Sequence, residues 1–114
     1  MKDLLINTLS TIRPYVALQG TMDEDEAYPD SFFTYWINDS EDHEDFDDEA
    51  FSYEFSFSVI FYTNDPADMY TVPDQTIAAL KAVGFIPNGP GWDVASDEPT
   101  HTGHAMEFYY IKYL

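Results

Sequence analysis

The sequence predicts an α+β domain in which an antiparallel sheet of about four to five strands is packed by two helices. Residues 51–62 alternate with period two between large apolar and mostly small polar side chains, which is typical of a strand in a sheet with one covered face. Two further segments, 3–12 and 72–83, carry apolar residues at helical spacing. The order of helix, strands, helix and strands then favours helices set apart from an antiparallel sheet.

The size of the chain suits a single domain spanning residues 1–114. Hydrophobic residues make up 45% of it, which is enough to bury one core. The sequence contains no cysteine, which excludes disulfides, thiolate zinc sites and cysteine nucleophiles. No apolar run approaches the roughly 20 residues of a membrane span, and the first ten residues do not resemble a signal peptide. We therefore expect a soluble, cytoplasmic protein.

The elements expected in the first part of the chain are short. A helix is expected over 3–12, where three apolar side chains share one face, and Pro14 ends it because the residue before a proline avoids the α region. A short apolar strand follows at 15–18. The segment 32–38, FFTYWIN, reads as a strand with aromatic side chains on both faces.

The most biased segment is 39–49, DSEDHEDFDDE, with eight acidic residues and Phe46 as its one large apolar residue. Mutual repulsion and the lack of apolar groups predict a solvated, flexible acidic loop within the domain. The wider stretch 21–49 holds 13 acids and no Lys or Arg. The acids of the loop that we single out are Glu41, Asp42, Glu44, Asp45, Asp47, Asp48 and Glu49.

The clearest strand spans 50–63 and ends at the sequence Asn-Asp-Pro. Asp65 and Thr71 are both candidate N-caps for the helical turns after this strand. We expect a short turn over 66–70 and then a helix over 72–83, closed by a glycine.

The last part of the chain contains two loops and a strand. The sequence NGPG marks a loop before an extended piece at 92–94, and 96–104 is a second, polar loop. Residues 105–113, AMEFYYIKY, have apolar groups on both faces and therefore predict an interior strand.

The charge excludes several classes of function. The chain has 22 acidic residues against four Lys or Arg, and a net charge of −18. It lacks the basic face that specific nucleic-acid binding needs, and it would be repelled by anionic membranes. No phosphate-binding loop, nucleophile elbow or dinucleotide motif is present, so we assign no catalytic residue and no cofactor, and we expect no enzymatic activity.

Metal binding has little support in the sequence. His101 and His104 have a spacing that suits a helix, but Pro99, Thr102 and Gly103 argue against a helix there and no third ligand is marked. Hydrogen bonding is the favoured role for both histidines. The acidic loop lacks the spacing and central glycine of an EF-hand, so we expect no metal site, although a Ca²⁺-responsive binding module remains an alternative.

The aromatic residues indicate an interface. Nine Tyr and nine Phe exceed what one small core comfortably holds. Tyrosine is enriched at interfaces because its ring is buried while its hydroxyl stays hydrogen-bonded. We therefore predict a subunit interface, with the candidates Tyr35, Tyr53, Tyr62, Tyr109 and Tyr113.

Several segments taken in order resemble the tail-terminator, or tail-completion, proteins of long-tailed bacteriophages and prophages of Gram-positive hosts. The resemblance covers roughly residues 30–111, and each segment is structural rather than chemical. The segments are FFTYWIN (32–38), the acidic insertion, YEFSFSVIFYTNDP (53–66), a helix ending in LKAVGF (80–85), and DVASDEPTHTGHAMEFYYI (93–111).

This resemblance implies a homo-hexameric ring that sits on the last ring of the tail tube, ends tube growth and offers a surface to the head connector. The partners would be further copies of the chain, the tail tube protein and the head–tail connector protein. DNA would pass through the ring without specific binding, and no membrane is involved. The protein would be found in the host cytoplasm during assembly and then in the virion tail.

Other functions remain open at this point. A head–tail joining protein or a minor tail protein shares the size and α+β character of a terminator. A small acidic protein can also imitate DNA and inhibit a DNA-binding enzyme, but the clustering of acids in a loop speaks against that role. A bacterial protein of no phage origin is the remaining alternative.

Overall fold

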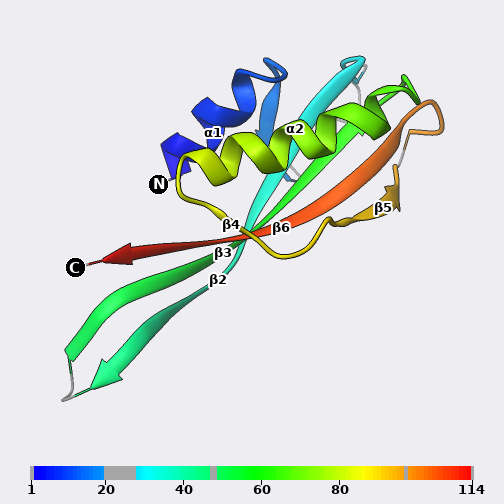
Figure 1. Cartoon of the computed structure of the whole chain (residues 1–114). Coiled ribbons are helices and arrows are strands. Elements are labelled where there is room, and N and C mark those ends of the chain that lie inside the picture. The colour runs from blue at the N-terminus through cyan, green and yellow to red at the C-terminus, as the bar shows by residue number, and fades with distance from the viewer. Residues whose placement is uncertain (1, 20–27, 47–48, 97, 114) are drawn as a thin grey trace.

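The computed structural model describes residues 2–19, 28–46, 49–96 and 98–113, with backbone alone for 39–46, 49–53 and 113. It confirms the α+β fold with a sheet packed by two helices (Figure 1). The described sheet has six strands, more than expected, and is mostly antiparallel. The elements are α1 Lys2–Ser10, β1 Val16–Leu18, β2 Ser31–Phe46, β3 Glu49–Thr63, α2 Asp68–Ala82, β4 Ile86–Pro87, β5 Trp92–Ala95 and β6 Thr102–Tyr113.

The strands follow the order β1-β2-β3-β6-β4, with β5 also paired to β6. The last strand along the chain, β6, is therefore interior, as its apolar residues on both faces predicted. β1 departs from the antiparallel pattern, because it pairs in parallel with β2 and aligns Val16 with Phe33. Parallel neighbours need a connection of about a dozen residues, and the chain from 19 to 30 has that length.

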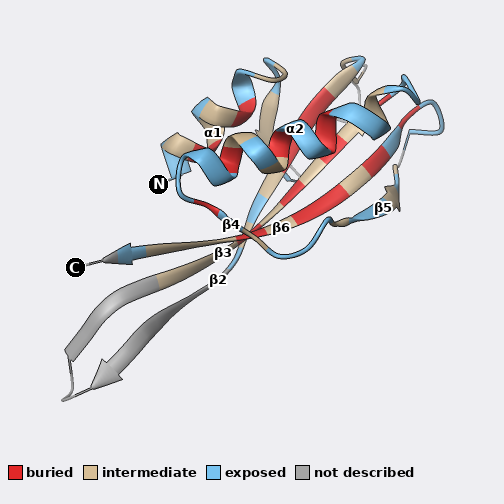
Figure 2. Ribbon diagram, viewed as in Figure 1, coloured by how far each residue is buried: buried red, intermediate tan, exposed pale blue. Residues whose placement is uncertain are grey.

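Both helices cover the same face of the sheet, and the core lies between the helices and that face (Figure 2). α1 buries Leu5 and Leu9, the apolar side of the predicted first helix. α2 buries Leu80 and Val72 against the aromatic side of β3. The opposite face of the sheet carries no helix within the described ranges. The fully buried residues of the sheet in this core are Phe33, Phe57, Val59, Phe61 and Phe108.

α2 begins earlier than expected. It starts at Asp68, so the segment that we predicted to be a separate turn is the first helical turn, and Pro73 lies inside the helix. Side chains before the helix fix this start: the backbone N–H of Ala67 donates to Asp65 at 3.0 Å, and Thr63 donates to Asp68 at 2.9 Å. Pro73 lacks the N–H that would bond to the carbonyl four residues earlier, and α2 nonetheless continues through it to Ala82.

The expectation of an acidic loop over 39–49 is wrong for the described part of that segment. β2 runs as a paired strand to Phe46, and β3 starts at Glu49, while residues 47 and 48 lie outside the described residues. The register aligns Asp42 with Tyr53 and continues from the buried part of the same hairpin. Backbone pairing to a strongly alternating strand therefore outweighs the repulsion between the acids.

A β-bulge interrupts the hairpin where the acidic segment begins. The register shifts between Ile37 and Asp39, which leaves Asn38 as the extra residue. The Asn38 side chain compensates by donating to the Ser58 hydroxyl at 2.8 Å. Beyond the bulge, the chain extends away from both helices as an arm (Figure 1). We use "the arm" for residues 39–46 of β2, 49–55 of β3 and 110–113 of β6, which pair side by side.

Candidate subunit interface

The arm exposes two strand edges. β1 pairs with β2 only from Phe33 to Tyr35, and in the described part of the chain no strand lies along the outer side of β2 beyond that point. On the other side, β4 pairs with β6 at Phe108 and Tyr109, and no described strand pairs outside residues 110–113. Such edges present unpaired backbone N–H and C=O groups, which are a template for adding another strand.

The two edges differ in charge. The β2 side of the arm contains five acids within residues 39–46 and no Lys or Arg. The β6 side, residues 110–113, contains Lys112 and no acid. Lys112 is exposed. The arm therefore has one strongly negative edge and one weakly positive edge, on opposite sides of the same three strands.

The structure places three of the five candidate tyrosines within the fold. Tyr35 packs against the core beneath the helices. Tyr62 stacks on Phe32 on the other face, with ring centroids 5.2 Å apart. The Tyr109 hydroxyl lies 3.3 Å from the Asn88 amide nitrogen. The side chains of the other two candidates, Tyr53 and Tyr113, lie outside the described residues, although both positions belong to the arm. Their contact with another copy stays a prediction.

The sequence analysis missed two exposed tryptophans. Trp36 on β2 is 47% exposed and Trp92 on β5 is 51% exposed. The register puts both on the face without helices. Trp36 lies opposite Ser58, and its neighbours Tyr35 and Ile37 pack against the core. Trp92 lies opposite Ala105, which alternates with the core residue Met106. The alternation in FFTYWIN was the available signal: once Phe33 faces the helices, residue 36 must face the other way.

A buried hydroxyl on the same face has no partner among the described residues. Thr34 is 4% exposed, and its Oγ1 makes no hydrogen bond to any of them. Leaving such a group unpaired costs about 1–3 kcal/mol relative to a solvated hydroxyl. Thr34 therefore weakens the chain slightly, at a position two residues before Trp36 on the same strand.

His101 and His104 make hydrogen bonds through every ring nitrogen. His101 lies in the loop before β6, with Nε2 at 2.8 Å from the Pro29 carbonyl and Nδ1 at 2.9 Å from the Thr100 hydroxyl. His104 lies on β6, with Nδ1 at 2.9 Å from the Asp93 carboxylate and Nε2 at 2.8 Å from a backbone carbonyl. Neither ring offers a free nitrogen to a metal ion in this arrangement.

Among the described side chains, no three His, Asp or Glu residues gather to hold a metal ion. The acids that we singled out between Glu41 and Glu49 lie outside that set, so a Ca²⁺-responsive role for them stays an open alternative.

No helix in the described ranges is both long and apolar enough to cross a membrane. No family model matches the chain, and no curated protein shows significant sequence similarity to it.

Proposed function

We propose that this chain is a structural protein whose copies join edge to edge through the arm and close into a ring, in the role of a phage tail terminator. The observation that carries the proposal is the arm itself: three paired strands that extend beyond the helices and have no further strand along either outer edge among the described residues. This role involves no catalysis and consists of assembling copies of the chain into a ring.

The strand directions favour a ring. β2 and β6 are each antiparallel to β3, so they run parallel to one another. When neighbouring copies are related by a rotation that keeps their arms side by side, the β6 edge of one copy meets the β2 edge of the next as a parallel pair. Such a contact uses two different surfaces, and repetition of the same rotation closes a ring.

Charge favours this contact over a two-fold dimer. Pairing β2 with β2 would set one acidic strand against another, at a cost of roughly up to 1 kcal/mol for each directly opposed pair of like charges. Pairing β6 with β2 instead sets the strand that carries Lys112 against the acidic strand. The complementary edges therefore select the heterologous contact.

In the ring, the acidic strands would line the lumen or lie against the neighbouring copy. A negative lumen repels DNA phosphates, so DNA would pass through without adhering. The ring would contain six copies, as the resemblance implies, sit on the tail tube and join the head connector. It would assemble in the host cytoplasm and remain in the virion tail. A head–tail joining role or a minor tail role would use the same interface.

Electron microscopy of tails made without this protein tests the proposal. Overlong tubes without heads are expected, and restoring the wild-type protein should restore tail length. Neutralising Asp47, Asp48 and Glu49 together should leave tail length normal and impair DNA ejection if the acids line the lumen. Tails of normal length that carry heads in the absence of the protein would contradict the proposal.

A DNA mimic is the second candidate, and one observation favours it. The acids from Asp39 to Asp45 lie on a paired strand rather than in a loop, so alternate residues are held about 6.6 Å apart on one face. The clustering of acids in a loop spoke against a DNA mimic, and the regular spacing along a strand answers that point. A stable two-fold dimer that displaces DNA from a restriction or repair enzyme would support the mimic, whereas a ring would support the terminator.

A further inference from the structure

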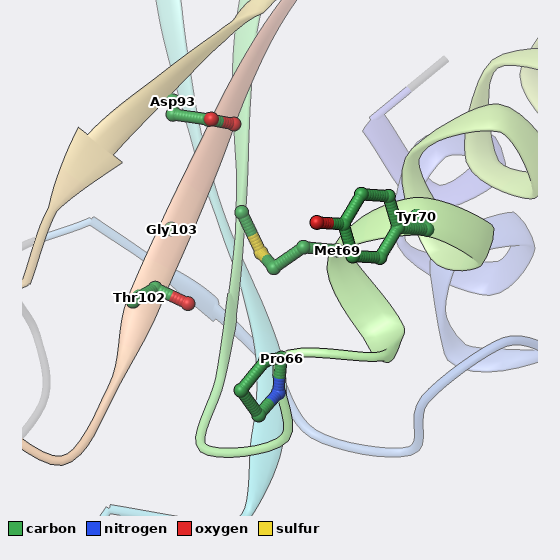
Figure 3. A pocket seen from close by; sticks show the side chains of 6 residues that line it. All are labelled: Pro66, Met69, Tyr70, Asp93, Thr102 and Gly103. Carbon is green, nitrogen blue, oxygen red and sulfur yellow. The ribbon is translucent and has the colours of Figure 1, made fainter.

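A cavity of about 310 Å³ lies at the end of the molecule away from the arm (Figures 1 and 3). Its walls come from three places: the loop before α2, the first turn of α2, and the paired strands β5 and β6. The lining residues are Pro66, Met69, Tyr70, Asp93, Thr102 and Gly103.

Asp93 is the charged residue of this lining, and it is held in place. Its Oδ1 lies 2.9 Å from the His104 Nδ1, while its other carboxylate oxygen has no hydrogen-bond partner among the described residues. The Asp93 side chain is 83% exposed, so that oxygen is open to solvent. The carboxylate is thus oriented by one contact and free to accept another.

Tyr70 and Met69 add an aromatic ring and an apolar thioether to the lining of the cavity. Tyr70 is 83% exposed, although most large apolar side chains of the chain are covered. Figure 3 shows the Tyr70 hydroxyl and the Asp93 carboxylate directed toward the same space, with the Met69 side chain between them. Asp74 lies one helical turn after Tyr70 on the exposed side of α2, which adds a second carboxylate to this end of the helix.

The lining combines the Tyr70 ring, the apolar side chains of Met69 and Pro66, and the free carboxylate oxygen of Asp93. These groups together fit a side chain that carries a cation at the end of an aliphatic stem. The ring attracts the cation, the thioether and the proline contact the stem, and the carboxylate accepts the hydrogen bond. The His104 ring occupies one oxygen of the Asp93 carboxylate and leaves the other oxygen open. The remaining attraction then comes from the free oxygen and from the field of the whole chain, whose net charge is −18.

We propose that this cavity binds a lysine or arginine side chain of a partner protein. The charge of the chain identifies the partner as basic. This chain has four Lys or Arg residues in all, and Arg13 already pairs with Asp68 at 3.4 Å. A basic partner therefore complements the surface better than a second acidic copy does. The inference does not depend on ring formation, because the cavity lies apart from the arm.

The test is a titration of the full-length, ¹⁵N-labelled chain followed by NMR at constant ionic strength. The probe is N-acetylarginine amide, and N-acetylnorleucine amide serves as a probe with a similar stem and no charge. Saturable shifts are expected at the amides of Met69, Thr102 and Gly103 with the arginine probe, at millimolar concentration. The norleucine probe should produce none.

Two variants make the test specific. Asp93→Asn keeps an oxygen for His104 and removes the charge, so it should weaken binding about tenfold with the spectrum otherwise preserved. Tyr70→Ala should weaken binding about threefold, the range expected for an exposed cation–aromatic contact. Asp3→Asn, a charge change on the exposed side of α1, is the matched control and should bind like the wild type.

The proposal is overturned if both probes produce the same shifts, if the shifts never saturate, or if Asp93→Asn binds arginine amide as tightly as Asp3→Asn does. Shifts confined to the arm would mean unspecific attraction to its acids and would also overturn it. Self-association of the wild type that Asp93→Asn abolishes would make the occupant a second copy rather than a basic partner. None of these results bears on tail length, so failure here is distinct from failure of the ring.

Discussion

His104 on β6 ties Asp93 on β5 to the sheet through a contact of 2.9 Å between Nδ1 and Oδ1. The second ring nitrogen lies 2.8 Å from the Pro90 carbonyl oxygen. The two ring nitrogens of His104 thus face two different oxygen atoms, one on β5 and one in the turn before it. This residue therefore holds an edge strand and the turn before it at the same time.

Replacing His104 with glutamine should loosen β5. The side-chain amide cannot reach both oxygens in the same geometry, so the free energy of unfolding is expected to fall by about 1–2 kcal/mol. Hydrogen exchange at the β5 amides should accelerate more than exchange at the β3 amides. Lys81→Gln, on the exposed side of α2, is the control. Equal exchange rates in the His104 variant and the wild type would contradict the expectation.

Two glycines near that turn should respond differently to alanine. Gly91 and Gly89 both have positive φ, at +82° and +76°, so both substitutions carry left-handed strain of about 1–2 kcal/mol. A Cβ on Gly91 would also clash with the Ala105 carbonyl oxygen, whereas a Cβ on Gly89 meets nothing within 4 Å. Gly91→Ala should therefore destabilise the protein by about 1–3 kcal/mol more than Gly89→Ala. Urea unfolding measures the difference, and equal losses would disprove the close approach.

The unpaired hydroxyl of Thr34 predicts a stabilising change. Thr34→Val removes a buried oxygen that has no partner among the described residues, so the free energy of unfolding should rise by up to about 1 kcal/mol or stay unchanged. Thr63→Val is the contrast, because the Thr63 hydroxyl donates to Asp68 and accepts from the Asp65 N–H. That variant should lose about 1.5–3 kcal/mol, as expected for a hydrogen bond to a charged group. Thermal unfolding of both variants measures these changes. A clear loss of stability in Thr34→Val would show that the Thr34 hydroxyl makes a hydrogen bond after all.

Reversing one charge on the arm should block assembly. Lys112→Glu places an acid on the edge that we assign to the acidic strand of the next copy, so rings should no longer form. Lys81→Glu makes the same change on the exposed side of α2 and should assemble normally. Sedimentation velocity over a range of concentrations compares the two variants. A two-fold dimer that persists in Lys112→Glu would contradict the β6–β2 contact.

The fold class was predictable because its strongest signals are periodic. The alternation along β3 and the apolar faces of the helices depend on side chains alone, and the structure has β3 and α1 close to the expected bounds. The start of α2 was misjudged because Asp65 and Thr71 are both candidate caps in the sequence, and the contacts that Thr63 and Asp65 make before the helix become visible only in three dimensions.

The acidic segment was misjudged because its composition predicts a loop while its pairing depends on distant residues. Residues 39–46 are paired because β3 alternates opposite them and β6 supports β3 from the other side. Trp36 could have been placed from the alternation in FFTYWIN, whereas the position of Trp92 depends on the pairing of β5 with β6. The cavity beside Tyr70 joins residues more than 20 positions apart in the sequence, so no local pattern predicts it.

The position of β6 has a consequence for biosynthesis. It is the last strand along the chain, yet it lies between β3 and the short edge strands. While the nascent chain is still on the ribosome, β3 has its β2 partner but lacks its other neighbour until residues 102–113 emerge. The β2–β3 hairpin therefore has an unpaired edge along β3 while α2 is being synthesised. During this interval the exposed edge and aromatic surface can associate with other nascent chains.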